Sequence, residues 1–226
     1  MNTALSVPPA EVLVGAAEAA FIADLDPKDL HRVIDESVLP DDLMSRSESR
    51  QFARLSAALA RFYFDTANEL SKAIRLQVIE TLMVRLRPRE NIAAILSLAG
   101  PLSSIDWSFH SGCLTVDLKS VIEHAAQRSV RARNSLRLVV EDPDVLGGRA
   151  TFRGTRVPID VAIGATTSGA GWARLKESYP FLTEDHVDAA NVYSVIRPRR
   201  GRPPKAEPAP KGWKVKSTRR IAATHE

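Results

Sequence analysis

The sequence predicts a mainly α-helical protein with small β elements, because apolar residues recur at helical spacing along most of its 226 residues. Two short stretches instead alternate apolar and polar residues, which is typical of β-strands. Prolines and glycines separate these stretches. The expected order is an N-terminal helix-turn-helix with a helical extension, a central β-hairpin plus helix, a C-terminal three-helix domain with a short strand pair, and an extended basic tail.

The N-terminal motif consists of two short helices around the turn "DLD". Alanine-rich "EVLVGAAEAAFIAD" predicts the first helix, and the second begins at Pro27, where Asp26 suits the N-cap. Leu30, Val33 and Ile34 follow at i, i+3 and i+4 and give the second helix one apolar face. Two such helices outline a helix-turn-helix.

Two longer helices are expected at residues 49–65 and 70–87. Their apolar residues repeat at helical spacing and predict core or dimer contacts. These residues are Phe52, Leu55, Leu59, Phe62 and Tyr63 in the first helix and Ile74, Val78, Leu82 and Leu86 in the second.

The central part of the chain predicts a hairpin. "SIDWSFHSGCLTVDL" alternates apolar and polar residues on both sides of "HSG", and a helix is expected next, at residues 119–134. Residues 136–140, "LRLVV", predict a short strand, and "TFRGTRVPI" predicts a second extended piece that turns at Gly154. The single cysteine, Cys113, cannot form an internal disulfide and is expected to be packed.

Three short helices are expected towards residue 196, the last capped by Thr183 with two acidic residues in its first turn. The predicted divisions are a helix-turn-helix domain with helical extension at 1–90, a hairpin-plus-helix connector at 91–137, a three-helix domain at 138–196 and a basic tail at 197–226.

Charge separates the tail from the rest of the chain. The tail has ten basic and two acidic residues, a net charge of +8, whereas residues 1–196 have 21 basic and 25 acidic residues, a net charge of −4. A basic tail of this kind indicates a polyanionic or carboxylate-rich partner. The sequence shows no run of about 18 apolar residues, no basic start of a secretion signal and no zinc-ligand spacing. We therefore expect a cytoplasmic protein without a metal, a cofactor or a membrane partner.

The region from Leu138 onwards contains the pattern "DP…GG…RGTR.P" followed by "YP.LT…..A..Y". The matching residues are Asp142, Pro143, Gly147, Gly148, Arg153, Gly154, Thr155, Arg156, Pro158, Tyr179, Pro180, Leu182, Thr183 and Tyr193. This order closely resembles the DUF433-type domain of prokaryotic antitoxins that are similar to the VapB partners of VapC toxins. In longer members a MerR-like helix-turn-helix precedes this domain, and "EAAFIADLDPKDLHRVIDESVLP" resembles that module.

The resemblance implies an antitoxin without enzymatic activity, and the residues agree with this. "GGRATFRG" lacks the spacing of a phosphate-binding loop. Asp185 and His186 are adjacent on one expected helix, so their side chains diverge and no catalytic triad is indicated. Arg153 and Arg156 are expected to fasten the extended piece to the helices.

DNA binding by the helix-turn-helix would depend on few cations. The candidate DNA-binding residues are Lys28, His31, Arg32, Arg46 and Arg50. Arg50 and Arg54 are expected on one helix face as phosphate contacts. The second helix is also acidic, and Arg32 with Glu36 at i, i+4 predicts a solvated ion pair. The alternative is a degenerate helix-turn-helix kept as a dimerisation domain.

The resemblance also implies a role for the tail, because PIN-domain ribonucleases of the VapC kind hold a metal such as Mg²⁺ in a carboxylate cluster. A guanidinium pairs bidentately with carboxylates, so a tail cation could replace that metal, with Trp213 as an apolar anchor. The candidate toxin-binding residues are Arg199, Arg200, Arg202, Lys205, Trp213, Lys214, Arg219 and Arg220. Two alternatives stay open: a solubilising tail, or DNA binding through "RRGRPPK", which contains the core of an AT-hook.

The predicted function is therefore an antitoxin that inhibits a VapC-like PIN-domain ribonuclease and represses its own operon through operator DNA, as a homodimer or a toxin–antitoxin hetero-oligomer. The alternative is a stand-alone DNA-binding transcription regulator that uses the helix-turn-helix and the AT-hook-like tail. A neighbouring gene for a PIN-domain protein would favour the antitoxin.

Overall fold

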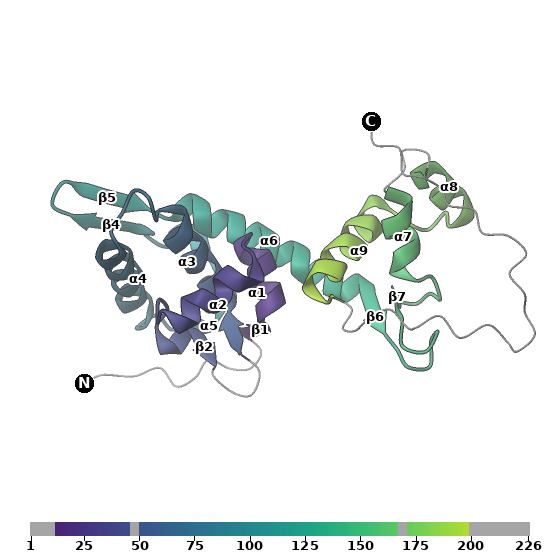
Figure 1. Ribbon diagram of the computed structural model, residues 1–226, viewed down its shortest axis with the longest axis horizontal. Coiled ribbons are helices and arrows are strands. Elements are labelled where there is room, and N and C mark those ends of the chain that lie inside the picture. Colours follow the sequence, from purple (N-terminus) through teal and green to yellow (C-terminus); the bar gives the residue numbers. More distant parts are fainter. Residues whose placement is uncertain (1–11, 46–49, 167–170, 199–226) are drawn as a thin grey trace, which may run out of the picture.

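The computed structural model describes residues 12–45, 50–166 and 171–198 and confirms a mainly α-helical fold with small antiparallel sheets. The helices are α1 (Ala16–Ala23), α2 (Pro27–Asp35), α3 (Arg54–Asp65), α4 (Lys72–Leu86), α5 (Ile92–Leu96), α6 (Lys119–Leu138), α7 (Ile159–Thr166), α8 (Gly171–Ser178) and α9 (Glu184–Ile196). The strands are β1 (Leu13–Gly15), β2 (Met44–Ser45), β3 (Gln51–Ala53), β4 (Ser108–Ser111), β5 (Leu114–Asp117), β6 (Val139–Glu141) and β7 (Ala150–Phe152). Figure 1 shows two bodies joined by the long helix α6.

The two predicted N-terminal helices are present as α1 and α2, joined by a short turn. The α2 helix begins at Pro27, as the sequence predicts, and Asp26 Oδ1 accepts a hydrogen bond of 2.8 Å from the Lys28 N–H. This bond satisfies one of the backbone donors that a helix leaves free at its N-terminus. Leu30 and Val33 of α2 are fully buried, which confirms the apolar face.

A three-stranded sheet, with β1 before α1 and with β2 and β3 after α2, was not predicted. β3 is its central strand, and Phe52 pairs with Val14 of β1 on one side and with Met44 of β2 on the other. The chain is therefore extended up to Ala53, and α3 begins at Arg54 instead of residue 49. Local periodicity could not show this, because the two partners that make Phe52 a strand residue lie elsewhere in the chain.

The first hydrophobic core extends from β1 to the first half of α6. It contains the predicted apolar stripe of α3 and, from α4, Val78, Leu82 and Leu86. The segment that follows residue 90 joins the same core through Ile95, Trp107 and Ile122. The central segment, predicted as a connector, thus packs with the N-terminal helices up to the middle of α6.

Strands β4 and β5 form the predicted hairpin. Ser111 pairs with Leu114, which leaves Gly112 and Cys113 as a two-residue turn. The φ angle of +60° at Gly112 is the left-handed conformation that this kind of turn requires at its first position. Cys113 is exposed in this turn, so the expectation that it is packed was wrong.

The α6 helix continues to Leu138, and residues 136–138 are helical instead of the start of a strand. Leu136 and Leu138 pack against the C-terminal core from the helix, and β6 begins only at Val139. β6 pairs antiparallel with β7, and Gly154, with φ +76°, forms the predicted turn after β7.

The second core lies among β6, β7, α7, α8 and α9. α9 begins after Thr183, as predicted, and the Thr183 N–H donates to Nδ1 of His186 at 3.3 Å. A third small cluster, formed by Ala132 of α6 with Val192 and Ile196 of α9, packs against Phe21 of α1. Among the helices of the described ranges, none is both long and apolar enough to cross a membrane.

Candidate nucleic-acid interface

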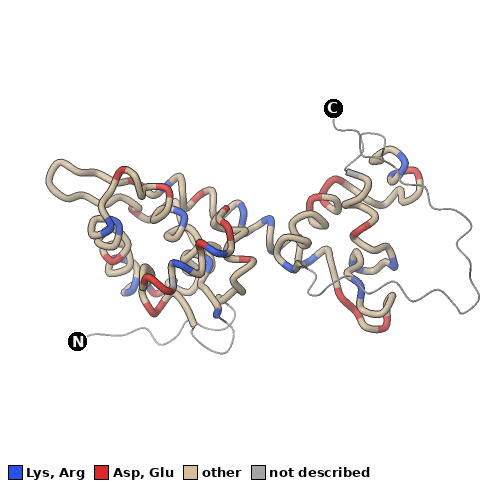
Figure 2. The backbone as a smooth tube through the Cα atoms, in the orientation of Figure 1, with Lys and Arg blue, Asp and Glu red and all other residues tan. Residues whose placement is uncertain are grey.

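The outer face of α2 carries three of the predicted DNA-binding residues. Lys28, His31 and Arg32 are all exposed, whereas Leu30 and Val33 of the same helix are buried. The helical repeat thus points these polar side chains away from the core. Figure 2 shows basic and acidic residues interspersed along the backbone of this body.

Arg32 is engaged by two carboxylates of its own helix region. Its guanidinium lies 3.4 Å from Asp29 and 3.4 Å from Glu36, which confirms the predicted i, i+4 pair. The guanidinium carbon also lies 5.4 Å from the ring centroid of Phe64. These contacts orient Arg32 and neutralise part of its charge, so Lys28 and His31 are the freer cationic and hydrogen-bonding groups of α2.

Arg50 reaches this face from another element. Its Nη1 lies 3.4 Å from Nδ1 of His31 and 3.7 Å from Oδ1 of Asp35. The structure therefore brings Arg50 and His31 together across 19 positions of sequence. Arg50 precedes β3 and is not helical, so its predicted place on one helix face with Arg54 was wrong.

Arg54 does not serve as a surface cation. Its Nη2 donates to Oε1 of Glu18 at 2.9 Å, and the two side chains are 12% and 10% exposed. A pair this buried joins α3 to α1 and leaves little of Arg54 for phosphate. Arg46, the other predicted contact of this region, lies outside the described residues.

Glu36 ties the end of α2 to the helices behind it. Its Oε2 accepts hydrogen bonds from Lys72 of α4 at 3.3 Å and from the Tyr63 hydroxyl of α3 at 3.2 Å. The Lys72 bond, with smaller contributions from Tyr63 and Arg32, holds the pKa of Glu36 below its ordinary value. Sequence reasoning treated Glu36 only as an acidic neighbour, because Tyr63 and Lys72 are distant in the chain.

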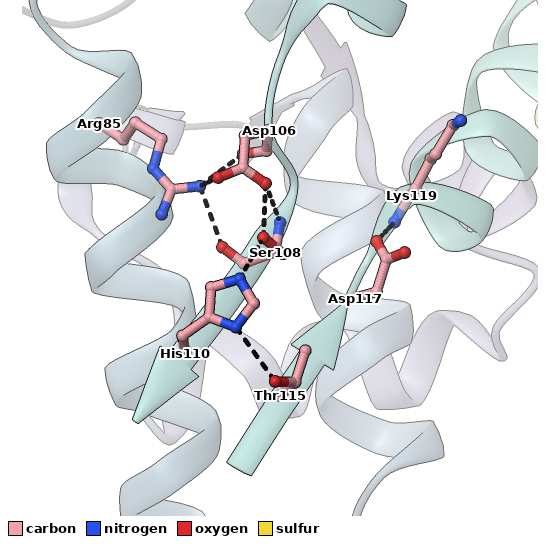
Figure 3. Close-up of polar contacts among 7 residues, drawn as sticks. All are labelled: Arg85, Asp106, Ser108, His110, Thr115, Asp117 and Lys119. Atoms are coloured by element: carbon pink, nitrogen blue, oxygen red, sulfur yellow. Dashed lines mark hydrogen bonds and ion pairs between the residues drawn. The ribbon is translucent and has the colours of Figure 1, made fainter. Parts of the chain in front are cut away.

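A row of polar side chains crosses the outer face of the hairpin (Figure 3). The Ser108 hydroxyl donates to Oδ1 of Asp106 at 2.5 Å and lies 2.9 Å from Nε2 of His110, whose Nδ1 lies 3.1 Å from the Thr115 hydroxyl. Because the serine proton is directed to the carboxylate, His110 is not placed to accept it as a general base. The hydrogen bonds from Ser108 lower the pKa of Asp106.

This row fastens the hairpin to α4. Arg85 Nη1 donates to the backbone oxygens of Asp106 at 2.6 Å and Ser108 at 3.0 Å, and it pairs with the Asp106 carboxylate at 3.0 Å. These contacts give the polar row a structural role in holding the hairpin against α4. The Ser108, His110 and Asp106 side chains are not arranged for nucleophilic catalysis.

In the C-terminal body, Arg153 fastens β7 to α6, as predicted. Its Nε donates to the backbone oxygen of Arg137 at 2.7 Å, and its N–H donates to that of Leu138 at 2.7 Å. Arg156 is exposed. His186 turns towards Thr183 and packs edge-on against Phe152, with ring centroids 5.2 Å apart.

A groove of about 450 Å³ lies between α6 and α9. It is lined by Arg131, Asn134, Ser135, Arg137, Leu138, Asp185, Asp188 and Ala189. Arg131 and Asp188 form a two-point ion pair in it, and Asp188 raises the pKa of Arg131 through that hydrogen bond. Two of its lining residues are basic and two are acidic, so the formal charges that line the groove cancel. In the parts of the chain that the structure describes, no three His, Cys, Asp or Glu side chains converge to hold a metal.

The predicted toxin-binding residues of the tail, from Arg199 to Arg220, all lie outside the described residues.

Comparisons with known proteins identify the C-terminal body. Residues 139–194 match the family described as "Protein of unknown function (DUF433)", which spans β6 to most of α9. Solved structures contain no significant match to the chain. The "Uncharacterized protein y4eO" of Sinorhizobium fredii is 30% identical over 219 residues, covering 96% of each chain. The two sequences thus share both bodies and not only the DUF433 segment, and the chain belongs to the same family as y4eO, with a DUF433 domain at its C-terminal end.

Proposed function

We propose that the protein is a DNA-binding antitoxin, in which the helix-turn-helix binds operator DNA and the DUF433 domain with its tail binds and inhibits a VapC-like PIN-domain ribonuclease. One observation carries the DNA-binding part: the exposed face of α2 presents Lys28 and His31, and Arg50 lies beside His31 from a separate element. The second helix of a helix-turn-helix is the element that enters the major groove.

The order of elements supports this use of α2. The two helices are followed by the antiparallel pair β2 and β3, and Arg50 lies at the end of the loop that joins these strands, in contact with His31 of the second helix. A cation there is suited to the phosphate backbone, while groups on α2 are suited to base edges. The resemblance to the MerR-like module agrees with the same arrangement.

The DNA-binding proposal is tested with the full chain, because the first core continues into α6 and a fragment ending near residue 89 would divide it. Binding to promoter DNA is measured by fluorescence anisotropy at several salt concentrations. We expect Arg50→Ala to weaken binding and to reduce the salt slope by about one, because it removes the proposed phosphate contact. Lys176→Ala, an equal loss of charge on α8, should change neither. A chain with no salt-sensitive binding would leave the helix-turn-helix only a scaffold role.

The antitoxin part of the proposal rests on the resemblance and on the charge of the tail, +8 against −4 for the rest of the chain. An extended cationic segment can enter a carboxylate-lined metal site and satisfy it through bidentate pairs. The matching experiment is co-expression with the adjacent gene product, followed by a ribonuclease assay of the purified complex.

Truncation after Ile196 removes the tail, residues 197–226, and retains every described helix and strand. We expect the truncated chain to lose inhibition while part of the contact with the ribonuclease persists. Undiminished inhibition would exclude a blocking tail, and a Trp213→Ala variant of the full chain then shows whether the apolar anchor matters for binding.

A further inference from the structure

The turn between α1 and α2 is conformationally unusual. Asp24 has φ 55° and ψ 43°, the left-handed region that residues with a side chain rarely adopt. The N–H of Leu25 donates to the Ala20 oxygen at 3.1 Å, and the N–H of Asp24 donates to the Phe21 oxygen at 3.2 Å. These two bonds are those of a Schellman motif, in which glycine is the usual residue. External contacts therefore help to hold this turn.

Two arginines from other helices supply such contacts. Arg61 of α3 donates to the backbone oxygen of Asp24 at 2.7 Å. Arg128 of α6 pairs with the Asp24 carboxylate at 3.0 Å, and its Nε donates to the Phe21 oxygen at 2.7 Å. Arg128 thus binds both the last turn of α1 and the first residue of the connecting turn, and its side chain is only 18% exposed.

Phe21 connects the Arg128 contacts with Asp24, called the clamp below, to the DUF433 domain. The guanidinium carbon of Arg128 lies 4.4 Å from the Phe21 ring centroid, within the range of a cation–π contact. The same Phe21 side chain packs against the small cluster formed by Ala132 of α6 with Val192 and Ile196 of α9. The last turns of α9 and the clamp on Asp24 therefore share one side chain.

We propose that Arg128 and Phe21 are positioning residues through which α9 of the DUF433 domain sets the geometry of the helix-turn-helix. The turn angle between α1 and α2 depends on Asp24, Asp24 depends on Arg128, and the stacking partner of Arg128 is held by α9. The consequence for DNA affinity rests on the function proposed above, but the structural link is measurable without DNA.

The first experiment compares the same substitution at two positions of α9 in the full chain. Val192 is 3% exposed in the Phe21 cluster, whereas Val195 is 57% exposed. Amide hydrogen exchange of Asp24 and Leu25 is measured by NMR. We expect Val192→Ser to accelerate exchange at both amides about tenfold and to weaken promoter binding by a similar factor, with Val195→Ser unchanged in both. Faster exchange confined to α9, with Asp24 and Leu25 unchanged, would overturn the proposal.

The second experiment keeps the proposal testable if Val192→Ser does not fold. Arg128→Met removes the clamp itself, and Lys119→Met removes an equal charge from the exposed start of the same helix. We expect Arg128→Met to accelerate exchange at Asp24 and Leu25 and to weaken DNA binding without changing the salt slope, because no phosphate contact is lost. A slope reduced by about one would make Arg128 a phosphate contact instead. If the chain does not bind DNA at all, the proposed function fails, and the exchange rates still decide the link between α9 and the turn.

Discussion

The contribution of an arginine to the stability of this protein depends on how deeply its side chain is buried. Arg54 and Glu18 form a pair of 2.9 Å at 12% and 10% exposure, whereas the Arg32 side chain is 59% exposed beside two carboxylates of its own helix region. Removing one member of a buried pair leaves a charge without compensation, whereas exposed pairs contribute little because water and salt screen them.

The same substitution at the two arginines tests this difference. We expect Arg54→Met to lower the free energy of unfolding by about 3 kcal/mol and Arg32→Met by less than about 1 kcal/mol. Urea denaturation followed by circular dichroism measures both. In a double-mutant cycle, adding Glu18→Gln to Arg54→Met should restore part of the loss, because it removes the unpaired carboxylate. Equal effects at Arg32 and Arg54 would contradict this account.

Glu36 gives the link between α2 and its supports a pH dependence. The folded state holds the pKa of Glu36 below its ordinary value, chiefly through the hydrogen bond from Lys72. A lowered carboxyl pKa stabilises the fold above its unfolded value, and this contribution disappears as the pH falls through the folded value. We expect Glu36→Gln to lose less stability than the wild type when the pH is taken from neutral to about 3. Parallel losses in urea titrations of both proteins would exclude this role.

At the scale of the elements, two glycines illustrate opposite requirements. Gly112 is in the β4–β5 turn with φ +60°, whereas Gly164 lies inside α7, where a Cβ would meet no atom within 4 Å. An added methyl group strains the turn but favours the helix, since alanine loses less backbone entropy than glycine on folding.

We therefore predict that Gly112→Ala destabilises the protein by about 1 kcal/mol and that Gly164→Ala stabilises it by about 0.5 to 1 kcal/mol. Thermal unfolding of the two variants, compared with the wild type, measures both signs. A stabilising Gly112→Ala would mean that the turn does not need the left-handed conformation.

At the scale of the whole molecule, α6 belongs to both bodies. Its first half packs in the N-terminal core through Ile122 and Ala125, and its last residues pack in the DUF433 core through Leu136 and Leu138.

A helix-turn-helix protein usually reads two half-sites about one DNA turn apart, so it binds as a dimer. We predict that the full chain sediments as a homodimer at micromolar concentration. A monomer in sedimentation velocity, with undiminished binding to a full operator, would refute this expectation.

The sequence by itself determined the elements whose signals are local. The N-cap at Asp26, the hairpin across Gly112, the turn at Gly154 and the cap of α9 at Thr183 all depend on neighbouring residues, and each was predictable. The charge of the tail and the DUF433 pattern are likewise written in consecutive residues.

Tertiary structure alone decided the rest. β3 is a strand because Phe52 finds partners in β1 and β2, and Arg54 is structural because Glu18 lies beside it. Arg128 has the same origin, since its three contacts come from Phe21 and Asp24, more than a hundred residues away. Periodicity reports which face of a helix is apolar, but only packing brings a distant charge or ring to that face, because burial is a property of the assembled core.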